Sequence, residues 1–80
     1  MGKNDKNNQE NQVVAIFGDY ITLGQLLKFV HIVNEGGMAK TYLLTHKVLV
    51  NEEADNRRGR KLRPGDKVTL DEGVFLIERK

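Results

Sequence analysis

The fold of this chain is decided by residues 22–33, which read TLGQLLKFVHIV. Apolar residues recur there at the spacing of one helical face: Leu23, Leu26, Leu27, Val30 and Val33. Thr22 stands where a helix N-cap is expected, because its hydroxyl can accept a hydrogen bond from a free backbone N–H of the first turn. Gly36-Gly37 follows and can supply a left-handed helix stop. The pattern predicts an amphipathic helix from Leu23 to Val33.

The segments around this helix predict a small α+β domain. A second, shorter helix is expected over residues 38–45. A strand is expected before the first helix, at residues 13–17, and three or four more follow His46, where the apolar pattern changes its period. These later strands are expected at residues 47–51, 61–63, 68–70 and 74–77. The turns between them are expected at Asp55-Asn56, Pro64–Asp66 and Glu72-Gly73.

Length and composition limit the kinds of protein this chain can be. The chain has 80 residues, enough for one domain, and a net charge of +2. Residues 1–12 hold no apolar residue except Met1 and are expected to form a disordered polar tail, with the folded domain at residues 13–80. The chain has no Cys and no Ser, which excludes thiolate metal sites and serine-hydrolase chemistry. Neither a membrane span nor a signal peptide is recognisable, so a cytoplasmic protein is expected.

The positive charge is concentrated in the middle of the chain. Residues 28–67 carry nine basic and five acidic residues, a balance of +4, whereas both flanking segments lean acidic. Six of the nine lie within eleven residues: Arg57, Arg58, Arg60, Lys61, Arg63 and Lys67. The arginine fork matches phosphate geometry, which favours a nucleic-acid-binding patch. The alternative is a solvated loop neutralised across a hairpin by Glu52, Glu53 and Asp55.

Other candidate sites give weaker signals. The helix start at Gly37-Met38, with Lys40 in its first turn, could offer backbone N–H groups to a phosphate, although two glycines are more often a simple turn. Phe17, Phe29, Phe75 and Tyr42 are expected in the core, so base stacking is not predicted. His31 and His46 lack metal-site spacing. No feature favours a metal, a cofactor or an enzyme.

The ordered series of motifs resembles the S4-like RNA-binding domain, specifically the small stand-alone bacterial proteins of the YaaA type. The motifs are Ile21–Lys28, Gly36–Lys40, Val48–Asn51, Asp55–Leu62 and Gly65-Asp66. The resemblance implies the S4-like (alpha-L) fold, in which two helices pack on a small twisted, mainly antiparallel sheet. It also implies RNA contacts from Lys40 and from Arg57, Arg58, Arg60 and Lys61. Broader S4 domains begin their first helix with an Arg-Leu-Asp-like triplet and their second with Ser-Arg, which here read Thr22-Leu23-Gly24 and Gly37-Met38.

The expected function is therefore non-catalytic binding of structured RNA, ribosomal or otherwise translation-related, through phosphate and shape recognition. The expected RNA-binding residues are Gly37, Met38, Lys40, Arg57, Arg58, Arg60, Lys61 and Arg63. The expected partners are structured RNA, the ribosome or ribosomal assembly particles, with the protein acting as a monomer. The alternative is an adapter that presents the same basic hairpin to an acidic protein partner.

Overall fold

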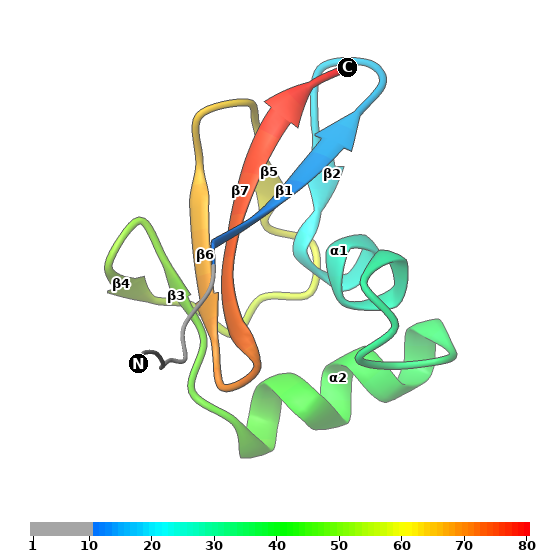
Figure 1. Ribbon diagram of the computed structural model, residues 1–80. Helices are drawn as coiled ribbons and strands as arrows, with labels where there is room; N and C mark the ends of the chain where they lie inside the picture. The colour runs from blue at the N-terminus through cyan, green and yellow to red at the C-terminus, as the bar shows by residue number, and fades with distance from the viewer. Residues whose placement is uncertain (1–10) are drawn as a thin grey trace, which may run out of the picture.

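The computed structural model describes residues 11–80 and confirms the α+β class (Figure 1). Two helices follow the second strand, and five further strands follow the helices. The elements are β1 (Asn11–Ile16), β2 (Ile21–Thr22), α1 (Leu23–Phe29), α2 (Gly36–Thr45), β3 (Leu49–Val50), β4 (Glu53–Ala54), β5 (Lys61–Leu62), β6 (Lys67–Leu70) and β7 (Gly73–Arg79).

The strands form a five-stranded sheet and a separate two-stranded sheet. The larger sheet has the order β1-β7-β6-β3-β4, and the smaller one pairs β2 with β5. Within the larger sheet only β1 and β7 run parallel, and the remaining pairs are antiparallel. The mainly antiparallel sheet expected from the resemblance is therefore confirmed. The β2–β5 pair matters for the site because it places the segment before β5 against the beginning of α1.

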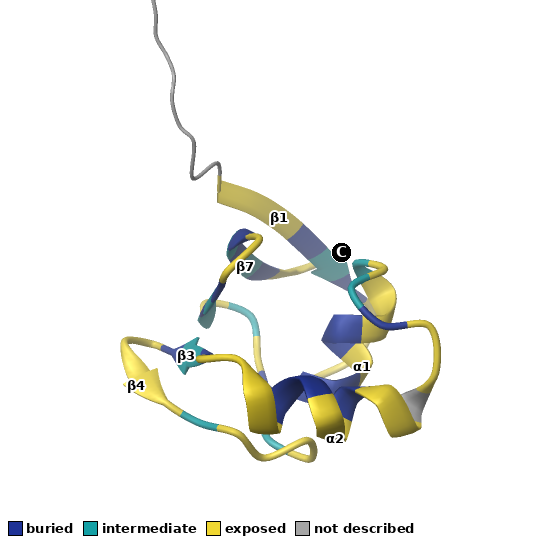
Figure 2. Ribbon diagram, turned by 90° about the horizontal axis from the view of Figure 1, so that it is seen from below, coloured by how far each residue is buried: buried dark blue, intermediate teal, exposed yellow. Residues whose placement is uncertain are grey.

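The core lies between the two helices and the inner face of the larger sheet (Figure 2). Three leucines of α1 are fully buried, Leu23, Leu26 and Leu27, and β7 turns Phe75 and Ile77 toward them. Burial of an aliphatic or aromatic side chain of this size contributes about 1.5–3 kcal/mol. The apolar stripe that predicts α1 is thus the stripe that anchors it to the sheet.

The first helix is shorter than its apolar spacing predicts. It ends at Phe29 because the chain turns into the left-handed region at His31, where φ is 66°. The N–H of Ile32 donates to the carbonyl of Leu27 at 2.9 Å, and that of His31 to Lys28 at 3.1 Å, which is a Schellman ending with histidine in the usual glycine position. Val33 still reaches the core from this non-helical segment.

The hairpin before the arginines also differs from the prediction. Its turn is Asn51-Glu52, with φ of 52° and 73°, rather than Asp55-Asn56. Two successive positive φ values are typical of the two-residue turns that match strand twist. Strand β1 begins at Asn11, two residues earlier than predicted, because Asn11 and Gln12 pair with β7. Residues 1–10, which hold most of the predicted tail, lie outside the described residues.

Candidate nucleic-acid interface

The segment from Asp55 to Arg60, which we call the arginine loop, is fastened to the beginning of α1. The N–H of Leu23 donates to the carbonyl of Arg60 at 2.8 Å, and the N–H of Gly24 to that of Arg58 at 2.9 Å. The first N–H groups of a helix have no partner within the helix, so the loop satisfies two of them. Thr22 and Gln25 form a capping box over the same turn. Main-chain hydrogen bonds therefore hold the Arg58 to Arg60 end of the loop against α1.

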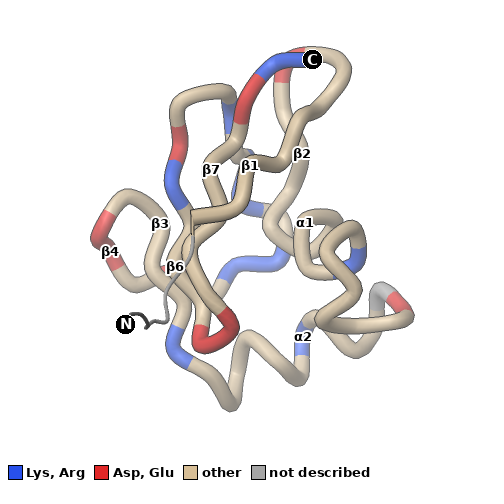
Figure 3. The backbone as a smooth tube through the Cα atoms, viewed as in Figure 1, with Lys and Arg blue, Asp and Glu red and all other residues tan. Residues whose placement is uncertain are grey.

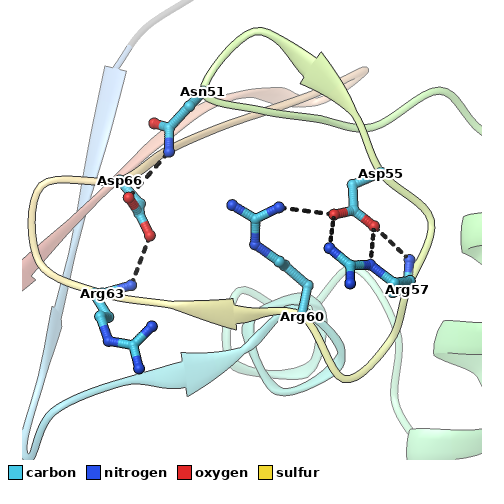
Figure 4. Close-up of polar contacts among 6 residues, drawn as sticks. All are labelled: Asn51, Asp55, Arg57, Arg60, Arg63 and Asp66. Carbon is cyan, nitrogen blue, oxygen red and sulfur yellow. Dashed lines mark hydrogen bonds and ion pairs between the residues drawn. The ribbon is translucent and has the colours of Figure 1, made fainter.

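A single carboxylate organises the loop from within (Figure 4). Asp55 accepts from the N–H of Arg57 at 2.9 Å, from its Nε and Nη2 at 3.1 and 2.9 Å, and from Nη1 of Arg60 at 2.8 Å. Its side chain is 8% exposed. The hydrogen bonds from Arg57 hold the pKa of Asp55 well below its usual range, and the same contact raises the pKa of Arg57. One carboxylate thus serves two guanidinium groups, which leaves the loop with a surplus of positive charge.

Arg58 takes no part in the Asp55 cluster and lies against α1. Its Cγ packs against Gly24, and with Lys28 it lines a shallow depression of about 290 Å³. Among residues 11–80, no carboxylate lies within ion-pair distance of Arg58 or Lys28. Two exposed cations therefore face the same small hollow, an arrangement suited to an anionic group with several oxygens, such as a phosphate.

We expect Gly24→Ala to displace Arg58 and to destabilise the domain by about 1–3 kcal/mol, because a Cβ at this position would lie 2.5 Å from the Arg58 Cγ and 3.3 Å from the Arg58 carbonyl oxygen. Urea denaturation measures the effect. Gly59→Ala is the matched control, since a Cβ there meets nothing within 4 Å. A Gly24→Ala variant as stable as the Gly59→Ala variant would contradict the close packing of Arg58 on α1.

The second helix borders the other side of the arginine loop. A groove of about 560 Å³ separates its C-terminal end from the loop, and Lys47, Arg57 and Arg60 contribute to the lining. Lys40 is an exposed residue of α2, and Figure 3 shows basic positions both on this helix and on the loop that shares the groove with it. At the helix start, the N–H of Met38 already donates to the carbonyl of Glu35 at 3.0 Å, so a phosphate there would have to share it.

The structure separates the remaining cations of the sequence cluster from the loop. Lys61 lies on β5 with its Nζ 4.9 Å from the centre of the Tyr20 ring. Arg63 lies in the turn after β5, which Figure 1 shows at the end of the molecule opposite α2. Asp66 accepts a hydrogen bond from the backbone N–H of Arg63 at 2.8 Å. Lys67 is paired with Glu52. The alternative drawn from the sequence, neutralisation by acidic residues, thus holds for Lys67 and in part for Arg57 and Arg60, although Asp55 lies in the same loop as its two arginines and not across a hairpin. It does not hold for Arg58.

Several residues of this region were not predicted from the sequence. Lys28 was not singled out because it stands alone, and only the fold brings it beside Arg58. The prediction that Phe17 and Phe29 are core residues is wrong: both are exposed. For Phe29 a signal existed, because it lies off the apolar stripe that the buried leucines define. Phe75 and Tyr42 are buried, as predicted.

Within the described part of the chain, no three His, Cys, Asp or Glu side chains group as metal ligands would. No helix of that part has the length and apolar character needed to cross a membrane. Tyr42, whose hydroxyl donates to Glu72 at 2.6 Å, has a pKa raised by burial and by that hydrogen bond. It therefore stays protonated at neutral pH, just as Asp55 stays ionised.

The fold and these motifs are those of a known family. The chain belongs to the S4 domain family, whose sequence profile matches residues 14–78. It is also similar to a protein of Bacillus subtilis (strain 168) named probable ribosome maturation protein RlbA. The two sequences are 53% identical over 58 residues, which cover 72% of this chain and 82% of the relative.

Proposed function

We propose that this protein binds structured RNA without catalysis, and that the RNA is ribosomal or a precursor of it. The observation that carries the proposal is the arginine loop fastened to α1, which presents Arg58 beside Lys28 at a fixed position. Membership of the S4 domain family supports RNA as the ligand. The name of the Bacillus subtilis relative supports ribosome maturation as the setting.

Phosphates of a folded RNA would lie over the surface between the two helices. Arg58 and Lys28 would contact one phosphate group, and Lys40, with the solvent-facing edge of Arg57, would contact others along α2. Arg57 remains available for this because its side chain is 69% exposed even while it is bonded to Asp55. Lys61 and Arg63 would contact RNA that extends along β5. Arg60 serves the site by holding Asp55, and Gly37 leaves room for close approach to the start of α2.

The titratable groups support binding rather than catalysis. A general acid or base needs a pKa near the working pH. The pKa of Asp55 is lowered and that of Tyr42 is raised, so both pKa values move away from neutral pH. Asp55 therefore stays ionised and Tyr42 stays protonated at the pH at which a catalyst would work. Their hydrogen bonds order the loop and the core side of α2, which is what a rigid binding surface requires.

The affinity of the protein for a short ribosomal RNA hairpin is expected to fall steeply with salt, with a slope of log affinity against log salt of about −3 if about four phosphates are neutralised. Arg58→Ala should make this slope shallower by about 1. Fluorescence anisotropy of the labelled hairpin over a salt series measures both. Lys67→Ala is the control, since Glu52 already pairs with this lysine.

Two outcomes would contradict the proposal. One is a salt slope near zero for the wild-type protein. The other is an equal loss of affinity in the Arg58→Ala and Lys67→Ala variants, since affinity would then follow overall charge. The ribosomal setting is tested separately, by sedimentation of the tagged protein with ribosomal particles from cells. Co-sedimentation should be abolished by nuclease, whereas survival after nuclease treatment would indicate a protein partner.

A further inference from the structure

Three aromatic rings are exposed together at the end of the molecule where β1 and β7 finish. Phe17 is 80% exposed, Phe29 57% and Tyr20 45%. They come from the loop after β1 and from the last residue of α1, and they border one shallow depression of about 680 Å³. A cluster of large apolar side chains on the surface commonly marks a binding site. We call these three residues the aromatic patch.

Cations surround the aromatic patch. The Nζ of Lys80 lies 5.0 Å from the centre of the Phe17 ring, and the Nζ of Lys61 lies 4.9 Å from that of Tyr20. Both distances are within the range of cation–π attraction. Lys28 lines the depression as well. Asp19, which lies between Phe17 and Tyr20 in the sequence, is paired with Arg79, whose Nη2 is 3.7 Å from its carboxylate, so the three lysines are not neutralised by it. The ligand of this patch should therefore combine flat apolar faces with negative charge.

The aromatic patch is continuous with the interface proposed above. Gln25 and Lys28 line both the depression beneath the three rings and the smaller hollow that holds Arg58. Lys28 therefore stands between the two sites, and a chain of phosphates leaving Arg58 would meet it before reaching Phe29. Because every base has a π-face, rings set between basic residues favour single-stranded nucleic acid.

Two other occupants fit less well. A second copy of the protein would bring Lys28, Lys61 and Lys80 against the same cations of its partner, which opposes association. Residues 2–10 of the chain are polar or glycine and offer no apolar side chain to bury against the rings. Neither a second copy of the protein nor residues 2–10 would bring to the patch a ligand that combines negative charge with flat rings.

We propose that unpaired nucleotides adjoining the structured RNA stack on Phe17, Tyr20 and Phe29, with their phosphates beside Lys28, Lys61 and Lys80. This inference rests on the proposed function, because the structured part of the same RNA would lie over the arginine loop. The protein then recognises a junction between a helix and a single strand: the loop binds the helical backbone, and the aromatic patch binds the strand that leaves it.

The test compares two labelled RNA probes, a short hairpin that ends flush and the same hairpin with a single-stranded oligouridine tail. The wild-type protein should bind the tailed probe about tenfold more tightly or better. The combined variant Phe17→Leu, Tyr20→Leu and Phe29→Leu keeps apolar side chains but removes the rings. It should lose this advantage and bind both probes with the wild-type affinity for the flush hairpin.

A second readout detects stacking directly. The chain has two Tyr and no Trp, so the tailed probe should quench the tyrosine emission of the wild-type protein, and Tyr20→Leu should remove the quenching because Tyr42 is buried. Val13→Thr, at an exposed apolar position of β1 that lines neither depression, is the control for general surface effects. Thermal melts establish that each variant is folded.

The outcomes separate this inference from the proposed function. Equal affinity of the wild-type protein for the two probes, with no quenching, overturns the stacking proposal. Failure to bind the flush hairpin at all contradicts the proposed function instead. Binding of the flush hairpin together with a tail advantage that depends on the rings supports both.

Discussion

Asp55→Ala is expected to lower the free energy of unfolding by about 2–4 kcal/mol and to release the side chains of Arg57 and Arg60 from their fixed geometry. The carboxylate is nearly buried and accepts hydrogen bonds from Arg57 and Arg60. Removing one member of such a cluster leaves the other charges without their partner, which costs more than the loss of an exposed ion pair. Urea denaturation followed by circular dichroism measures the change.

Glu52→Ala is the matched control for this variant. It removes the same charge from the neighbouring turn, but Glu52 is 65% exposed and its ion pair with Lys67 lies at the surface. Exposed ion pairs contribute about 0–1 kcal/mol. If the two variants were equally stable, Asp55 would not be the organising group of the loop, and the fixed position of the arginines would need another cause.

The pH dependence of stability provides an independent measurement of the same carboxylate. Folding lowers the pKa of Asp55 below its ordinary value of 3.8, mainly through the hydrogen bonds from Arg57. A carboxyl group of this kind contributes its full stabilisation above its unfolded pKa and loses it as the pH falls toward its folded pKa. The difference in unfolding free energy between the wild-type and Asp55→Ala proteins should therefore be constant from neutral pH to about pH 5 and shrink below about pH 4.

The sequence predicts the class of fold and the arginine loop because those features depend on local pattern. Apolar spacing identifies α1 and α2, and the density of arginines between Arg57 and Arg63 marks the loop. The end of α1 could not be predicted in the same way, because a histidine occupies the left-handed position where glycine is usual. The Asn51-Glu52 turn between β3 and β4 was not predicted for a similar reason, since Glu52 occupies a position that glycine usually takes.

What lay beyond prediction is chiefly the pairing of residues distant in sequence. Arg58 and Lys28 are thirty positions apart, and they meet because main-chain hydrogen bonds fasten the loop to Leu23 and Gly24. Whether Asp55 faces the arginines or the solvent also depends on the turn, so both interpretations of the charge cluster remained open from the sequence. The exposed rings were hidden for a related reason: a phenylalanine in an apolar context reads as core unless the fold shows which way it points.

Reversing the charge of Lys28 and Arg58, the two basic side chains that lie together at α1, is expected to have the largest effect on RNA affinity. The combined variant Lys28→Glu and Arg58→Glu should bind the flush hairpin about 100-fold more weakly, and its salt slope should be shallower by about 2, because two phosphate contacts are lost and two repulsions replace them. The fold should be retained, since both side chains lie at the surface and the loop is fastened through main-chain atoms.

The control is a second double variant that changes the net charge by the same amount at other positions. Lys67→Glu and Arg79→Glu alter cations that lie on β6 and at the end of β7 and already contact Glu52 and Asp19. If affinity followed net charge alone, both double variants would lose it equally, and the site at α1 would have no special role. At physiological salt, long-range electrostatic attraction is screened over about 8 Å, whereas direct contact with a phosphate is not. A loss of affinity confined to the Lys28→Glu and Arg58→Glu variant therefore means that RNA is bound where the arginine loop meets the first helix.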